Sequence, residues 1–375
     1  MLSRRTFLAS SAAVGSLSLL PSSGLLFAAD DTAAKYEGMV TKAIGFLGTK
    51  AQSSDGSYNA AAGPGVTALV VTGILKHGRS PDDPLVAKSL KYLEGFVQQD
   101  GGIYATESFY KNYETCLAIL ALSEANKSGR YNAVLKKAEA FIKDNQWDEK
   151  EEKGKDDYFY GGAGYGRSKR PDLSNTTFML DALKATGNDE NSEAMQKALV
   201  FISRCQNLET EHNTTPFAAK NPDGGFYYTP AAGGNSQAGT DEKTGGLRSY
   251  ASMTYAGLKS MIYAGIKPDD PRVKAAVNWL KKHYDLKENP GMGTSGLYYY
   301  YHTFAKALSA LGQDTFTDEK GIEHNWRQEL ITELASRQHD DGSWVNENSR
   351  WLEGDSSIVT GYALLALAYC KPKQK

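Results

Sequence analysis

The 375-residue chain has no surplus of charge of either sign, since 42 Lys and Arg face 44 Asp and Glu. A nucleic-acid-binding protein needs a basic surplus to neutralise phosphates, so this balance argues against that class of partner. Cysteine is equally scarce: Cys116, Cys205 and Cys370 are far apart and in no CxxC spacing. Three scattered thiols do not make a disulfide framework, and we expect them to be buried as small apolar residues.

Long hydrophobic runs are absent beyond the N-terminus, where no stretch of eighteen consecutive apolar residues occurs. The mature chain is therefore expected to have no integral membrane segment. The first residues have the layout of a signal peptide: Arg4 and Arg5 precede a short apolar core, and small residues lead to Ala28 and Ala29.

The paired arginines, followed by Phe7 and Leu8, resemble the twin-arginine export signal of bacteria. The alternative is an ordinary secretory signal in which the arginines are paired by chance. We predict that residues 1–29 are a twin-arginine-type signal peptide, removed after export to the periplasm or the cell exterior.

Glycine and tyrosine are plentiful, at 37 and 22 residues, and many of them fall in repeated pieces. One piece begins a helix: the chain reads Pro-Asp-Asp-Pro at 81–84 and again at 268–271. The second Asp can cap a helix whose first turn holds the second Pro. Another piece is a turn of the form Asp-Gly-small-aromatic, in which glycine tolerates positive φ and Asp supports the turn. Its copies start at Asp55, Asp100, Asp223 and Asp341.

A third piece is an apolar helix rich in small residues, found six times. Its copies begin at Val66-Thr67, Glu114-Thr115, Asn175-Thr176, Tyr250-Ala251, His302-Thr303 and Val359-Thr360. Each unit is thus an outer amphipathic helix, a turn and an inner apolar helix, and one unit cannot bury its inner helix alone. We predict an all-α fold, a single (α/α)6 toroid of six helix-pair repeats over residues 33–371. Two long connections, 147–172 and 207–248, are expected at one rim.

The pattern resembles the terpenoid cyclase and protein prenyltransferase superfamily, above all the squalene–hopene cyclase type, whose repeats end in Gln, a short gap, Gly and an aromatic. The piece from Gln338 through Asp341-Gly342 to Trp344 fits this pattern well, and Gln98 with Asp100-Gly101 fits in part. The resemblance spans nearly the whole mature chain. It implies the fold and leaves the reaction open.

The family's catalytic marks are incomplete in this sequence. Such cyclases protonate their substrate with an Asp-x-Asp-Asp-Thr motif, and no such string occurs; Asp355 before the last inner helix is a lone acid. Protein prenyltransferases hold zinc with Asp, Cys and His, and Tyr301-His302-Thr303 looks like their His segment. The companion Asp-x-Cys has no match, so zinc is not expected and no cofactor or metal is predicted.

The starts of the inner helices are expected to converge on one aromatic pocket. The substrate-binding candidates there are Tyr113, Glu114, Asn175, Tyr250, Tyr301 and His302. The catalytic candidates are Asp355, Glu114 and His302. Each has a purely structural alternative, since Glu114 can cap or form an ion pair, Asn175 can cap, and the Tyr298–Tyr301 run can serve packing.

Three functions remain open from the sequence. One is a terpenoid-cyclase-like protein acting on a polyprenyl or other apolar lipid, whose aromatic walls would stabilise a carbocation. Another is a carbohydrate-active lyase or hydrolase that uses two acids such as Glu114 and Asp355. The last is a binding or scaffold module without chemistry. The expected partner is a small apolar or carbohydrate ligand, and no nucleic acid.

Overall fold

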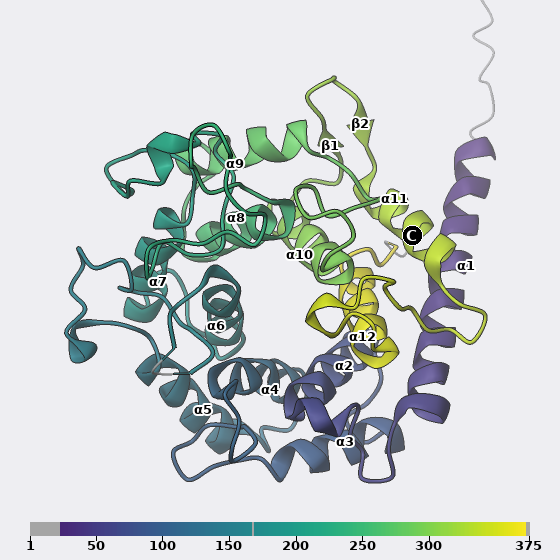
Figure 1. The fold of residues 1–375 in the computed structure, drawn as a ribbon. Coiled ribbons are helices and arrows are strands. Elements are labelled where there is room, and N and C mark those ends of the chain that lie inside the picture. Colours follow the sequence, from purple (N-terminus) through teal and green to yellow (C-terminus); the bar gives the residue numbers. More distant parts are fainter. Residues whose placement is uncertain (1–22, 167–168, 373–375) are drawn as a thin grey trace, which may run out of the picture.

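The structure, a computed structural model, describes residues 23–166 and 169–372 and holds twelve α-helices within them. One set, here called the outer helices, lies on the outside in Figure 1: α1 (Ser23–Phe46), α3 (Pro84–Glu94), α5 (Asn132–Asp144), α7 (Glu193–Arg204), α9 (Pro271–Lys282) and α11 (Trp326–Arg337). The other set, the inner helices, lies around the centre: α2 (Pro64–Lys76), α4 (Lys111–Ala125), α6 (Leu173–Ala185), α8 (Ala251–Tyr263), α10 (Leu297–Ala310) and α12 (Ser356–Ala368). The prediction of an all-helical chain built from helix pairs is confirmed.

The only strands among the described residues are two-residue pieces, β1 (Phe316–Thr317) and β2 (Glu323–His324), which form a small antiparallel hairpin before α11. The expected signal-peptide arginines lie outside the described residues. Helix α1 runs through the expected cleavage point at Ala28 and Ala29.

Two outer helices begin as their sequence indicates. The carboxylate of Asp83 accepts a hydrogen bond from the Leu85 N–H, and that of Asp270 accepts one from the Arg272 N–H. Pro84 and Pro271 occupy the first position of α3 and α9, where the missing N–H has no intrahelical partner to lose. Capping and proline placement together therefore fix where these helices start.

The four Asp-Gly turns share one geometry. In each, the aspartate Oδ1 accepts a hydrogen bond from the backbone N–H two residues later, at 2.9–3.0 Å. The glycine has a φ between +83° and +93°. At Gly342 a Cβ would lie 2.3 Å from the Lys42 carbonyl oxygen, so the backbone of another helix passes too close for any side chain.

Glutamine side chains tie three of the turns to an outer helix. Gln206 Nε2 donates to the Gly224 and Arg272 carbonyls, both at 2.9 Å, and Gln338 Nε2 donates to the Gly342 and Met39 carbonyls, both at 3.0 Å. Gln146 makes the same pair of bonds in the long 147–172 unit. This is the physical role of the repeated Gln: it satisfies two buried carbonyls that belong to different units.

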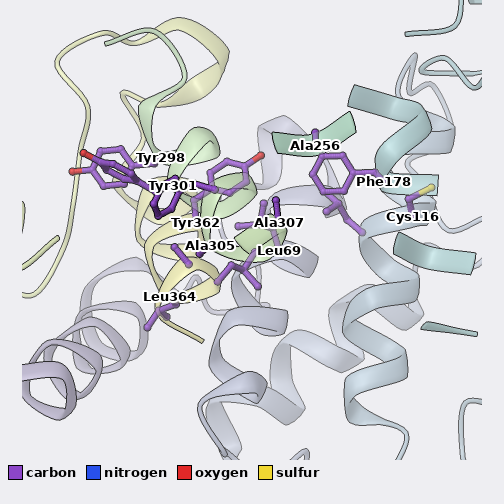
Figure 2. Packing of buried hydrophobic residues seen from close by; sticks show 14 of the residues in the cluster. Leu69, Cys116, Phe178, Ala256, Tyr298, Tyr301, Ala305, Ala307, Tyr362 and Leu364 are labelled. Carbon is purple, nitrogen blue, oxygen red and sulfur yellow. The ribbon is translucent and has the colours of Figure 1, made fainter. Parts of the chain in front are cut away.

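The inner helices pack side by side in chain order, and α12 packs against α2 (Figure 1). Small residues allow this contact, since a Cβ on Gly361 would lie 2.5 Å from the Leu69 side chain and one on Gly73 would lie 3.1 Å from Leu364. Figure 2 shows this apolar interior around Leu69 and Leu364. The prediction for the cysteines is confirmed, because all three are free and buried.

Candidate functional site

A hydrogen bond from a backbone N–H to a threonine hydroxyl sets the register of five inner helices. The hydroxyl oxygen accepts a hydrogen bond from the backbone N–H that follows the preceding turn, at 2.9–3.2 Å; the residues are Thr67, Thr115, Thr176, Thr254 and Thr360. In α8 this residue is Thr254, so Met253 takes the position equivalent to Glu114 and Asn175. The alignment that put Tyr250 at this level is therefore wrong by three residues, because the repeat in α8 had no Thr at the expected place to fix it.

The carboxylates of the two acidic candidates are both held by hydrogen bonds. Glu114 is 3% exposed, and its carboxylate accepts from the Ala105 N–H at 3.0 Å and the Ser108 hydroxyl at 2.8 Å. Burial raises its pKa. Asp355 caps α12 through the Ser357 N–H and also accepts from the Asn59 side-chain amide at 2.8 Å. Both carboxylates thus order loops at the inner-helix starts.

The other candidates at this level are also buried. The Asn175 amide donates to Asp172 Oδ2 at 2.8 Å while its Oδ1 has no hydrogen-bond partner among the described residues. Tyr250 precedes α8 and is 2% exposed. The Tyr301 hydroxyl donates to the Leu286 carbonyl at 2.7 Å, and Figure 2 shows Tyr298 and Tyr301 away from Phe178. Of the tyrosines from Tyr298 to Tyr301, Tyr299 contacts Phe178 of α6 and Tyr362 of α12, whereas Tyr300 contacts Tyr255 of α8.

Four aromatic side chains from four inner helices contact one another across the centre. They are Tyr113 of α4, Phe178 of α6, Tyr299 of α10 and Tyr362 of α12. The Tyr113 and Tyr362 hydroxyls are 3.2 Å apart, and the rings of Tyr113 and Phe178 meet edge to face at 5.1 Å. We call these four residues the aromatic layer. They fill the centre just below the inner-helix starts.

A cavity of about 350 Å³, here called the axial pocket, lies on the other side of the aromatic layer. Its apolar wall comes from five of the inner helices and consists of Leu69, Leu117, Leu120, Phe178, Tyr263, Leu365 and Tyr369. Exposed Lys76 and Lys184, at the C-terminal ends of α2 and α6, stand at its mouth. The pocket therefore opens at the helix ends opposite those where the sequence candidates were expected to gather.

Three charged side chains form a cluster at the floor of the axial pocket: Asp181 and Lys306 line the pocket, and Lys259 lies behind them in an adjoining narrow gap. Asp181 of α6 is in ion-pair contact with Lys259 of α8 and Lys306 of α10, each with an N–O distance of 2.6 Å. All three side chains are at most 10% exposed. Burial opposes the charge on Asp181, but the two ammonium groups outweigh it and lower the pKa to about 2. Burial lowers the pKa of Lys259 to about 8, against the opposing effect of Asp181.

His302 is the one sequence candidate that lines the axial pocket. It also lines a narrow gap that reaches Lys259 and Tyr299 beneath the floor. Burial and the nearby Lys306 lower its pKa to about 3, so the imidazole is neutral at physiological pH. Its Nδ1 is buried with no hydrogen-bond partner among the described residues. The neighbouring lysines make this imidazole a poor zinc ligand, because they would repel a dication.

Sequence reasoning missed the charged floor. Asp181, Lys259 and Lys306 are isolated charges inside helices whose other buried residues are mostly apolar or small. A lone charge on a helix expected to be buried on all sides is a signal that could have found them, since such a charge needs a partner. Within residues 23–166 and 169–372, no group of three His, Cys, Asp or Glu side chains is arranged to hold a metal ion.

Comparison with known proteins agrees with this architecture. Residues 57–230 match the family described as squalene-hopene cyclase C-terminal domain. A variant of the type II terpene cyclase MstE from Scytonema, without ligand, matches over 92% of this chain and 99% of its own, with 13% sequence identity and a TM-score of 0.55. Another variant of that enzyme, in complex with its substrate geranylgeranyl dihydroxybenzoate, matches over the same shares and with the same identity at a TM-score of 0.35.

No curated protein matches the sequence closely enough to be called a relative. No helix of the described residues is long and apolar enough to cross a membrane. At 13% identity the structural match concerns the fold, and the family match covers 174 residues of the chain. The predicted resemblance is thereby confirmed: residues 57–230 are similar to the squalene-hopene cyclase C-terminal domain, and the chain has the helical fold of a type II terpene cyclase.

Proposed function

We propose that the protein is an exported (α/α)6 toroid of six helix pairs that binds an apolar terpenoid or polyprenyl ligand in its axial pocket. The observation that carries the proposal is the pocket itself. It measures about 350 Å³, and its wall is made of leucines and aromatic rings from five inner helices. Pockets for small ligands have this size and an apolar wall, and polar and charged side chains, among them Asp181, His302 and Lys306, line the rest of this pocket. The related fold of a type II terpene cyclase supports the ligand class.

The buried acids favour binding over proton-initiated cyclisation. A cyclase of this type needs a strongly acidic carboxyl that still carries its proton. Asp181, the carboxylate of the pocket floor, is held ionised by two lysines, with its pKa near 2. Asp172 at the start of α6 is shifted by burial to a pKa of about 6, which makes it a weak acid. Neither side chain suits protonation of an alkene, so we assign the pocket a binding role.

The carbohydrate alternative is weakened by the state of its two acids. A glycosidase needs one carboxyl to donate a proton and another to act as base or nucleophile. Both oxygens of Glu114 accept hydrogen bonds from the 105–108 loop, and both oxygens of Asp355 accept hydrogen bonds from α12 or Asn59. Because both carboxylates are engaged in ordering the loops around them, we do not propose a sugar-cleaving reaction.

Binding of farnesol and geranylgeraniol to the purified protein tests the proposal. We expect either alcohol to bind, and extraction of the freshly purified protein to release a co-purifying polyprenyl. Leu120 lines the pocket and is half-buried, so Leu120→Trp should fill the space and weaken binding at least about tenfold. Leu199→Trp, at a half-buried position of α7 on the outside, is the matched control and should bind as the wild type does.

Circular dichroism of each variant would show that its helices are intact. A folded wild-type protein that takes up neither alcohol, in titration or in native mass spectrometry, would contradict the proposal. Equal weakening by Leu120→Trp and Leu199→Trp would place the ligand somewhere other than the axial pocket.

A further inference from the structure

The floor of the axial pocket carries a net positive charge. Two ammonium groups, Lys259 and Lys306, share the single carboxylate of Asp181, and all three are buried. At the mouth Lys76 pairs with Glu124 at 3.1 Å and adds no net charge. A buried charge without a counter-ion is costly, so a floor with one positive charge in excess favours an anion from outside.

Unused hydrogen-bond donors at the floor also favour an anionic ligand. Lys259 Nζ donates to Asp181 and to the Thr177 carbonyl at 3.3 Å. Lys306 Nζ has three donors, and within the described part of the chain Asp181 Oδ2 is its one partner. His302 Nδ1, also buried, has none there. The neutral imidazole can present an N–H from this atom in one of its tautomers.

These groups meet the apolar wall at one place. Lys306, His302 and Asp181 line the axial pocket together with Leu69, Leu117 and Leu365. A ligand that lies along the leucines therefore has its end beside an ammonium group and an imidazole. The arrangement fits an amphipathic molecule, with an apolar chain toward the wall and a small polar group at the floor.

We infer that the axial pocket is built for an apolar chain ending in a carboxylate, whose single negative charge completes the Asp181–Lys259–Lys306 floor. This inference rests on the proposed function and adds the chemistry of the ligand's head group. The carboxylate oxygens accept from Lys306 Nζ and His302, and the ion pairs of Asp181 stay in place. A phosphate monoester carries up to two charges and exceeds the single positive charge in excess at the floor.

The test compares three probes of one chain length: farnesoic acid, farnesol and farnesyl phosphate, titrated into the wild-type protein at neutral pH and moderate salt. We expect the acid to bind at least about tenfold more tightly than the alcohol, and more tightly than the phosphate. Equal affinity for acid and alcohol would overturn the inference while leaving the proposed function standing. Tighter binding of the phosphate would overturn the assignment of a carboxylate. Binding of none of the three would overturn the proposed function itself.

Substitutions at Lys306 locate the effect. Lys306→Gln removes the charge and keeps a donor, and we expect the preference for the acid over the alcohol to fall to about equality. Lys306→Arg keeps the charge and should keep the preference. Lys143→Gln, in an ion pair with Glu139 on the outer helix α5, is the matched control and should behave as the wild type. A folded Lys306→Gln protein that still prefers the acid would overturn the inference, and the wild-type comparison stands even where a variant does not fold.

Discussion

Single charges inside apolar helices determine the character of the pocket. Asp181, Lys259 and Lys306 are buried in three different inner helices, and each would be costly alone. Their ion pairs offset this cost, and the two lysines keep the Asp181 carboxylate ionised with its pKa near 2. Burial and the nearby Lys306 lower the pKa of His302 beside them, so its imidazole is neutral at physiological pH. At neutral pH the floor of the pocket therefore carries a net positive charge, which declines as the pH approaches the Lys259 pKa of about 8.

His302 should make the protein less stable as the pH falls below about 6.5. Its pKa is about 3 in the folded protein and 6.5 in the unfolded chain, so between these values the unfolded chain binds the extra proton. The free energy of unfolding should drop by up to about 1.4 kcal/mol per pH unit in this window because of this residue. Urea unfolding at pH 7, 6, 5 and 4 measures the slope.

The matched comparison is His302→Gln, which removes the titrating ring and leaves every other histidine and carboxylate in place. Its slope should be shallower than that of the wild type by most of the same amount. Parallel slopes for the two proteins between pH 6 and 4 would show that the folded protein protonates His302 readily.

At the scale of the element, caps and turns could be predicted and register could not. The Asp-Pro starts of α3 and α9 and the four Asp-Gly turns obey local rules, in which a side chain satisfies a backbone N–H two residues away. The register of α8 depends on Thr254 accepting from the Phe226 N–H, 28 residues earlier. A hydrogen bond between residues so far apart in the chain leaves no pattern in the local sequence. The repeat pattern therefore placed Tyr250, rather than Met253, at the level of Glu114.

Two glycine substitutions should have opposite effects on stability, because Gly361 lies in the tight contact between α12 and α2 and Gly45 lies in open space. A Cβ at position 361 would lie 2.5 Å from Leu69 Cδ2 and 3.1 Å from Val70, so Gly361→Ala should destabilise the protein by about 1–3 kcal/mol. Gly45 in α1 has no atom within 4 Å of such a Cβ, so Gly45→Ala should stabilise it by up to about 1 kcal/mol through helix propensity. Thermal and urea unfolding of both variants provide the measurement, and a Gly361→Ala protein as stable as the wild type would contradict the tight α2–α12 contact.

At the scale of the whole molecule, the inner helices divide the centre into two levels. The aromatic layer occupies the level of the helix starts, and the axial pocket occupies the level of the helix ends. The sequence candidates at the helix starts, among them Glu114, Asn175 and Asp355, order the loops that enter each helix. The axial pocket lies at the opposite ends of these helices, and His302 is the one sequence candidate that lines it.

At the scale of the whole chain we propose export by the twin-arginine route, on the basis of Arg4 and Arg5. The double substitution Arg4→Lys and Arg5→Lys should stop translocation and leave the full-length precursor in the cytoplasm, because this route requires the arginine pair. Fractionation with mass measurement of the N-terminus reports the outcome. Arg130→Lys on the outer surface is the control and should be exported and shortened as the wild type is. Normal export of the double variant would instead identify an ordinary secretory signal.

The sequence by itself determined the helix pairs, their turns and caps, the buried free cysteines and the resemblance to squalene–hopene cyclases. These follow from composition and from interactions between residues close in the chain. Only the tertiary structure decided where the pocket lies and what charge it holds. Asp181, Lys259 and Lys306 are separated by 78 and 47 positions, and their meeting depends on the packing of α6, α8 and α10 around one centre. Burial then fixes their charges, and burial is a property that the packed helices create together.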